Sequence, residues 1–251
     1  MIEGINGAPF IDMSPYIDTK QLESLFVPVA RGIAKYGPLP IAYFPPKTKD
    51  QTYKDMNDLD VCDDKSIEAE YLNTLTQLTA QERYRFAELT NKVIAAGGYI
   101  ELRHSKSRRY KDIFEQSLCE DNKAAISLFP ELMQFVKTLP FESIGRIVIF
   151  VSNPFVEGQI HSDLATAQEY LFPPLENKKA YKNQNFIWFN PSGRKKFFVY
   201  DEDTKEKHIV DTKACFFNTW DYHGSESTDE TTFSFRIDGK FIPQLKEQLC
   251  L

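Results

Sequence analysis

From about residue 143, the chain consists of short segments rich in β-branched and aromatic residues, separated by turn residues. The two clearest turns are Asn-Pro-Ser-Gly at 190–193 and Asp-Glu-Asp at 201–203. Strands are expected near 144–151, 158–163, 185–190, 196–201, 206–210, 213–219 and 231–237. Several short strands at this spacing indicate a β-sandwich or a barrel.

The first half of the chain has a different character and reads as mainly helical. Residues 18–35 place apolar side chains at helical spacing. A capping box at 79–82 opens a second expected helix, and a third, short helix is expected to end before Pro140. The polar stretch 46–70 is expected to be a loop or a marginal helix. The basic run 103–111 is expected to be a solvated loop and the start of a helix, with contact to an anionic substrate group as the functional alternative.

No Gly/Ser-rich or Pro-rich segment separates the two halves, so a single domain over 1–251 is expected. Its fold class would be α+β, with 1–142 as mainly helical support for a β core at 143–242. We expect the helices to cover one face of that core.

Composition excludes several classes of protein. A hydrophobic content of 42% is too high for a disordered chain, and a net charge of −6 argues against binding to nucleic acid or to a membrane surface. No apolar run approaches the about 18 residues of a membrane span, and the first residues do not resemble a signal peptide. None of the four cysteines forms a Cys-x-x-Cys pair, which favours reduced thiols and a cytoplasmic protein.

The sequence Gln-Ile-His-Ser-Asp at 159–163 carries the first candidate for chemistry. His161 and Asp163 are two residues apart in an expected strand, so their side chains would point to the same face. One imidazole and one carboxylate supply two ligands for a divalent metal such as iron. The alternative is a structural hydrogen-bonded pair. A metal site would need a third ligand and open coordination positions.

Two histidines follow downstream. His208 lies in a charged run that reads as an exposed hairpin, whereas His223 ends an apolar segment that begins at Phe216. His223 is therefore the better third ligand. The alternative is that His223 caps a turn, with Ser225 as its partner.

An arginine also lies in an apolar strand, the segment Phe-Ser-Phe-Arg-Ile at 233–237. A desolvated arginine needs an anion, and no acidic residue in that strand is expected to pair with Arg236. Pairing with Glu157 or Asp221 across the sheet would be a structural alternative to binding an anionic ligand.

The order His161-x-Asp163, His223, Arg236 resembles the signature of the Fe(II)- and 2-oxoglutarate-dependent dioxygenases, over about residues 143–240. The resemblance implies a double-stranded β-helix (jelly-roll) core in which the two histidines and the aspartate bind Fe(II). Arg236, helped by Ser234, would hold the distal carboxylate of 2-oxoglutarate. Some family members carry Arg-x-Ser or Arg-x-Thr in this strand, where this chain has Arg236-Ile237-Asp238.

The activity implied by the resemblance is hydroxylation or desaturation of a small metabolite, such as an amino acid or a derivative, with O2 and 2-oxoglutarate as co-substrates. One alternative is a peptide or protein hydroxylase. Another is a jelly-roll metal-binding protein without 2-oxoglutarate turnover, and a third is a cupin-like isomerase or a dioxygenase without a co-substrate. Arg236 distinguishes these hypotheses, because only the 2-oxoglutarate hypothesis requires it.

Overall fold

The computed structural model describes residues 2–36, 98–106, 110–152, 158–163 and 184–251. The described residues form a mixed α/β structure with two antiparallel sheets. The larger sheet has seven strands in the order β1-β9-β6-β11-β4-β2-β3. Their bounds are Phe10–Asp12, Ala214–Phe217, Asn185–Phe189, Thr232–Phe241, Phe141–Ser152, Gly98–Ser105 and Cys119–Asp121.

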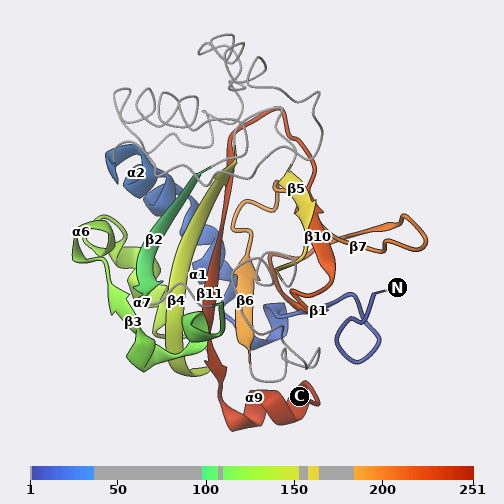
Figure 1. Ribbon diagram of the computed structural model, residues 1–251. Coiled ribbons are helices and arrows are strands. Elements are labelled where there is room, and N and C mark those ends of the chain that lie inside the picture. The colour runs from blue at the N-terminus through green and yellow to red at the C-terminus, as the bar shows by residue number, and fades with distance from the viewer. Residues whose placement is uncertain (1, 37–97, 107–109, 153–157, 164–183) are drawn as a thin grey trace.

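The smaller sheet has four strands in the order β5-β10-β7-β8. Their bounds are Gly158–His161, Tyr222–Ser225, Phe197–Tyr200 and Lys207–Ile209. Figure 1 shows β5 and β10 side by side, apart from the long strands β2, β4 and β11. From β4 to β11 the chain passes repeatedly between the two sheets, an arrangement compatible with a β-sandwich or a jelly roll.

Each of the seven strands expected in the second half has a counterpart in the structure. One difference is that 216–225 is not a single strand. The chain leaves β9 at Phe217, turns, and enters the other sheet as β10 at Tyr222. Asn218 makes this turn, because its Oδ1 accepts from the Trp220 amide at 3.2 Å and its carbonyl accepts from the Asp221 amide at 3.0 Å.

The described part of the first half contains both helices and strands. Its α-helices are α1 (Thr19–Ser24), α2 (Phe26–Tyr36), α6 (Lys123–Ile126) and α7 (Pro130–Val136). Three 3₁₀ segments (Ser14–Tyr16, Tyr110–Phe114 and Gln116–Leu118) accompany them. The expected helices near 18–35 and before Pro140 are therefore present.

A mainly helical first half is not what the described residues show, because they also supply β1, β2 and β3 to the larger sheet. The basic run begins inside β2 rather than in a loop. The helix expected after the capping box at 79–82 and the polar stretch 46–70 lie outside the described residues.

Strand β11 shows how the core and the polar interior share one element. Phe233 and Phe235 pack against the helices: Phe233 stacks on Phe26 of α2 at 5.3 Å, and Phe235 meets Phe135 of α7 at 6.4 Å. The alternate residues, Ser234, Arg236 and Asp238, are buried on the opposite face. β11 therefore separates the core packed by the helices from the face that carries Ser234, Arg236 and Asp238.

Two further observations complete the fold. A short helix, α9 (Pro243–Gln248), follows β11 near the C-terminus (Figure 1). Among the described residues, no helix combines the length and the apolar character needed to cross a membrane.

Candidate metal centre

The register of β5 and β10 brings the two expected histidine ligands together. His161 and His223 are directly paired across these antiparallel strands, and their ring centroids lie 4.5 Å apart. β5 ends at His161, and Asp163 lies just beyond the strand. Two hydrogen bonds tie this segment to the β9–β10 turn: Ser162 Oγ donates to the Trp220 carbonyl, and the Asp163 amide donates to the Thr219 carbonyl, both at 2.9 Å.

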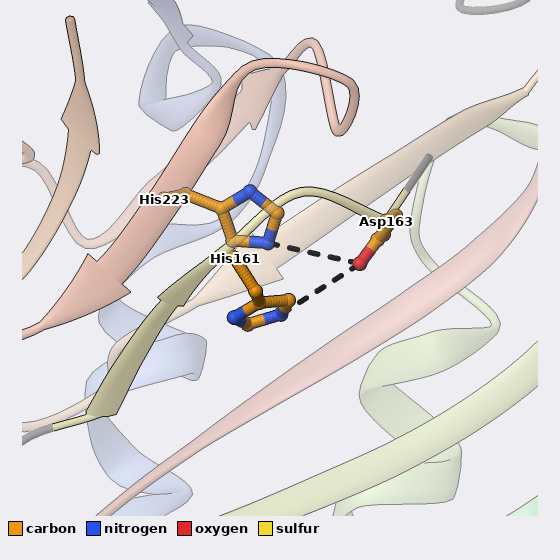
Figure 2. Close-up of side chains that lie close together, drawn as sticks. All are labelled: His161, Asp163 and His223. Atoms are coloured by element: carbon orange, nitrogen blue, oxygen red, sulfur yellow. Dashed lines mark ion pairs between the residues drawn. The ribbon is translucent and has the colours of Figure 1, made fainter. Parts of the chain in front are cut away.

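His161, Asp163 and His223, hereafter the His-Asp-His group, could hold a metal ion (Figure 2). Asp163 Oδ1 lies 3.8 Å from Nε2 of His161 and 3.8 Å from Nε2 of His223. Two ligand atoms each about 2.1 Å from a shared ion are at most about 4.2 Å apart. Both nitrogen–oxygen distances are within that limit, and all three ligand atoms lie within 4.8 Å of one another, so the group could hold a divalent metal.

The second ring nitrogen of His223 determines how the imidazole is presented. His223 Nδ1 lies 2.9 Å from the Asp221 carbonyl oxygen, which can only accept, so Nδ1 carries the proton. Nε2 then directs its lone pair toward Asp163. Burial, and next the nearby His161, lower the pKa of His223 to about 4. The ring is therefore neutral at pH 7, the form that binds metals.

Asp221 holds this arrangement from the other side. Its carboxylate accepts from the amides of Glu3 and Gly4, each at 2.8 Å, which joins the N-terminal segment to the turn before His223. Burial raises the pKa of Asp221, and the two amide hydrogen bonds oppose that shift. Asp221 is thus not the partner of Arg236 that the sequence left open, and Glu157 lies outside the described residues.

Arg236 approaches the outer oxygen of Asp163. Its Nη1 lies 3.2 Å from Asp163 Oδ2, and its Nε donates to Asp238 Oδ1 at 2.6 Å. The expectation that no acidic residue of this strand pairs with Arg236 is therefore wrong. Asp238 is two residues along β11, where a strand places side chains on the same face. The guanidinium also lies over the Phe186 ring, 4.0 Å from its centroid.

Ser234, the other residue expected to contact a co-substrate, lies on the same face of β11. It is fully buried, and its Oγ makes no hydrogen bond to any residue that the structure describes. A buried hydroxyl without a partner is costly, so this atom is a suitable contact for a polar ligand.

The remaining described histidines are not part of the His-Asp-His group. His104 pairs with Glu120 at the surface, and His208 lies on β8 opposite Val199. Two aromatic rings lie beside the buried His223: the ring centroids of Phe217 and Phe197 are 5.0 and 5.8 Å from that of the imidazole. Residues that the sequence did not single out, above all Asp238 and Arg146, complete the polar surroundings. For Asp238, the only sequence signal of its contact with Arg236 is the spacing of two residues within one strand.

Comparison with known proteins finds remote similarities only. No family model and no curated protein matches the chain. A crystal structure of a Pseudomonas putida prolyl-4-hydroxylase is 8% identical, with 93% of each chain covered and a TM-score of 0.41. The nickel complex of the non-haem monooxygenase ThoJ is 15% identical, covering 74% of this chain and 69% of that one, with a TM-score of 0.28. Such distant likenesses do not define a family, so the functional argument depends on the geometry of the site.

Proposed function

We propose that the protein is an Fe(II)- and 2-oxoglutarate-dependent oxygenase that hydroxylates or desaturates a small molecule. The observation that carries this proposal is the convergence of two imidazole Nε2 atoms and one carboxylate oxygen in the His-Asp-His group. Two histidines and one carboxylate with open positions are the ligand set of non-haem Fe(II) oxygenases.

The strand order supports a double-stranded β-helix core at 143–242 within a single domain. Eight consecutive strands divide into β9-β6-β11-β4 in one sheet and β5-β10-β7-β8 in the other. In this arrangement His161 and His223 come from adjacent strands of the smaller sheet, while Arg236 reaches Asp163 from the larger sheet. The proposed metal centre thus lies between the two sheets.

Bound Fe(II) would activate O2 and supply the oxidising power that side chains lack. The protein's own residues would bind and orient. The two imidazoles and Asp163 would hold the metal, and Arg236 with Ser234 would receive the distal carboxylate of 2-oxoglutarate. Phe197 and Phe217 would keep water away from His223.

The charges around Arg236 favour a dianionic co-substrate. Arg146 and Arg236 contribute +2, and Asp163 and Asp238 contribute −2, so these four residues sum to zero. A divalent ion bound at Asp163 would leave an excess of +2 in a largely buried place, where the Asp163 side chain is 16% exposed. 2-Oxoglutarate, with two carboxylates, would bring that excess back to zero, which matters because an uncompensated buried charge is costly.

One observation favours a second candidate, a metal-binding protein with this scaffold but without 2-oxoglutarate turnover. Arg236 already meets two carboxylates within the chain, so it does not require a co-substrate to be paired. In that case the sheets and the His-Asp-His group would serve to hold a metal alone. A peptide or protein hydroxylase differs from the main proposal only in its substrate.

The test is anaerobic reconstitution with Fe(II) and 2-oxoglutarate. We expect a weak metal-to-ligand charge-transfer band that requires both components and disappears in His223→Ala. The band should persist in His208→Ala, which removes a histidine outside the His-Asp-His group. Adding candidate small molecules should perturb the band and, with O2, yield succinate. Tight Fe(II) binding with no band and no succinate would instead support the metal-binding scaffold.

A further inference from the structure

Four charged side chains form a continuous chain of contacts that begins at the metal centre. Asp163 Oδ2 meets Arg236 Nη1 at 3.2 Å, and Arg236 Nε donates to Asp238 Oδ1 at 2.6 Å. Asp238 Oδ2 in turn accepts from Arg146 Nε at 2.9 Å. Asp238 is completely buried, so each of its oxygens has exchanged water for one arginine.

The backbone is irregular at the point where this chain is assembled. β11 runs regularly against β6 from Phe235 to Gly239, but against β4 its register shifts between Ile237 and Gly239. Because Ile237 pairs with Ile147 and Gly239 with Ile144, two β4 residues, 145 and 146, lie opposite Asp238 alone. This is a bulge in β4, and bulges re-aim side chains beside functional sites.

A glycine permits this bulge. A Cβ atom added to Gly145 would lie 2.0 Å from the Ile113 carbonyl oxygen, so no larger residue fits there without displacing backbone. The residue after it is Arg146, whose Nε reaches Asp238. The close backbone approach and the arginine contact therefore occur in consecutive residues.

We infer that Asp238 and Arg146 are positioning residues of the metal centre, a role that rests on the proposed function. With both oxygens of Asp238 held, the plane of its carboxylate is fixed, and the guanidinium of Arg236 is held with it over Phe186. Arg236 then holds Oδ2 of Asp163. The other oxygen, Oδ1, is left turned toward the two imidazoles, 3.8 Å from each Nε2.

This role predicts an effect on metal affinity. Hydrogen-bonded partners behind metal ligands typically contribute about 10–100-fold in metal affinity. Asp238→Asn keeps the size of the side chain but turns an NH2 group toward one of the arginines. It also removes a negative charge, so Arg236 lies less compensated beside the metal. Both changes weaken cation binding, and the expected loss is about 10–100-fold.

The experiment is a titration of the full chain with Mn(II), followed by electron paramagnetic resonance, for wild type, Asp238→Asn, Arg146→Gln and Glu230→Gln. Glu230 is the matched control, because it is also a buried carboxylate paired with an arginine, Arg194 at 2.7 Å, and is not one of the four residues of the charged chain. Asp238→Asn should bind Mn(II) about 10–100-fold more weakly, and Arg146→Gln should bind it more weakly by a smaller factor. Glu230→Gln should match wild type in affinity even where its thermal stability falls.

The outcomes separate this inference from the proposed function. If wild type binds Mn(II) and both Asp238→Asn and Arg146→Gln bind it equally well, the charged chain is structural only, and the metal centre still stands. If wild type binds no Mn(II), the metal centre fails and the inference fails with it. Should Asp238→Asn not fold, Arg146→Gln decides alone, because the Arg146 side chain is 20% exposed and its replacement leaves the Asp238–Arg236 pair in place.

Discussion

Replacing Arg236 by lysine or by alanine tests the structure at its most constrained charge. Its guanidinium makes three contacts: Nη1 with Asp163 at 3.2 Å, Nε with Asp238 at 2.6 Å, and its face with Phe186 at 4.0 Å. A lysine has one point charge and no planar fork, so it cannot make both carboxylate contacts in this geometry. Arg236→Lys should therefore lose about one charge-assisted hydrogen bond.

Such a bond contributes about 1.5–3 kcal/mol, which corresponds to roughly 10–150-fold in an equilibrium constant. We expect Arg236→Lys to raise the 2-oxoglutarate concentration that gives half-maximal succinate formation by a factor in that range. Because the same side chain touches Asp163, metal affinity should fall as well. The sequence alone gave no reason to couple the two effects.

Arg236→Ala should be more severe, because both Asp163 and Asp238 lose the arginine contact and Asp238 keeps only Arg146 as a cationic partner. Breaking a buried pair costs about 3–5 kcal/mol, and at about 2–4 °C per kcal/mol for a chain of this size the melting temperature should fall by about 6–20 °C. Calorimetry, Mn(II) titration and succinate formation are the three assays. Unchanged values in all three for Arg236→Lys would refute the assignment of Arg236 to both the metal centre and the co-substrate.

Three further predictions address the ligands, a buried lysine and the N-terminal contact. Alanine at any position of the His-Asp-His group should abolish stoichiometric Fe(II) binding, whereas His208→Ala should keep it; the reverse pattern would show that the third ligand is wrong. Burial lowers the pKa of Lys195 to about 8 from 10.5, so its charge destabilises the fold below pH 8 and that cost disappears as the pH rises to about 10.5. In urea unfolding, Lys195→Met should therefore be more stable than wild type by up to about 3 kcal/mol at pH 7 and by little near pH 10, and equal stability at pH 7 would contradict this. Asp221→Asn should lose one of the two amide hydrogen bonds and lower the free energy of unfolding by about 1–3 kcal/mol. Because His223 would then be held less firmly, Mn(II) binding should weaken too. Unchanged unfolding in calorimetry and unchanged Mn(II) affinity would show that the N-terminal contact is unimportant.

The strands of the second half were predictable because their pattern is local. Alternating or continuous apolar segments bounded by turn residues identify β4, β6, β7, β9 and β11 without knowledge of their partners. The division of these strands between two sheets was not predictable in the same way, because it depends on pairings between residues far apart in sequence. The turn at Asn218 shows this: the apolar run continues up to it, and only the change of sheet separates β9 from β10.

Strand β2 was missed although its signal was present. Ile100 and Leu102 are fully buried and alternate with Glu101 and Arg103, the period of a strand with one covered face. The concentration of basic residues from Arg103 onward directed the interpretation toward a solvated loop. Charged side chains at every second position are compatible with a strand, so the alternation was the better guide.

The proximity of the three residues of the His-Asp-His group was predictable from the sequence, but the residues around them were not. His161 and Asp163 were joined by the rule that residues two apart in a strand share a face, although β5 ends at His161 and Asp163 lies just beyond it. The same rule applies to Arg236 and Asp238, and applied there it predicts the pair found at 2.6 Å. The contact of Arg236 with Asp163 was beyond the sequence, because 73 residues separate them and their approach depends on how the two sheets face each other.

The alternation of β11 links the stability of the fold to the chemistry of the site. A slip of one residue would turn Arg236 and Asp238 toward the helices and would move Phe235 toward the metal centre, because side chains on a strand change face at every step. Buried charges without partners cost several kcal/mol each, so this register is strongly preferred over its neighbours. The bulge in β4 opposite Asp238 then allows the two long strands to remain paired while Arg146 turns to the carboxylate. Residues that set the pairing of β11 with β4 thus also hold the charged chain that reaches Asp163, so a substitution at Gly145 or Asp238 would act on the proposed metal centre as well.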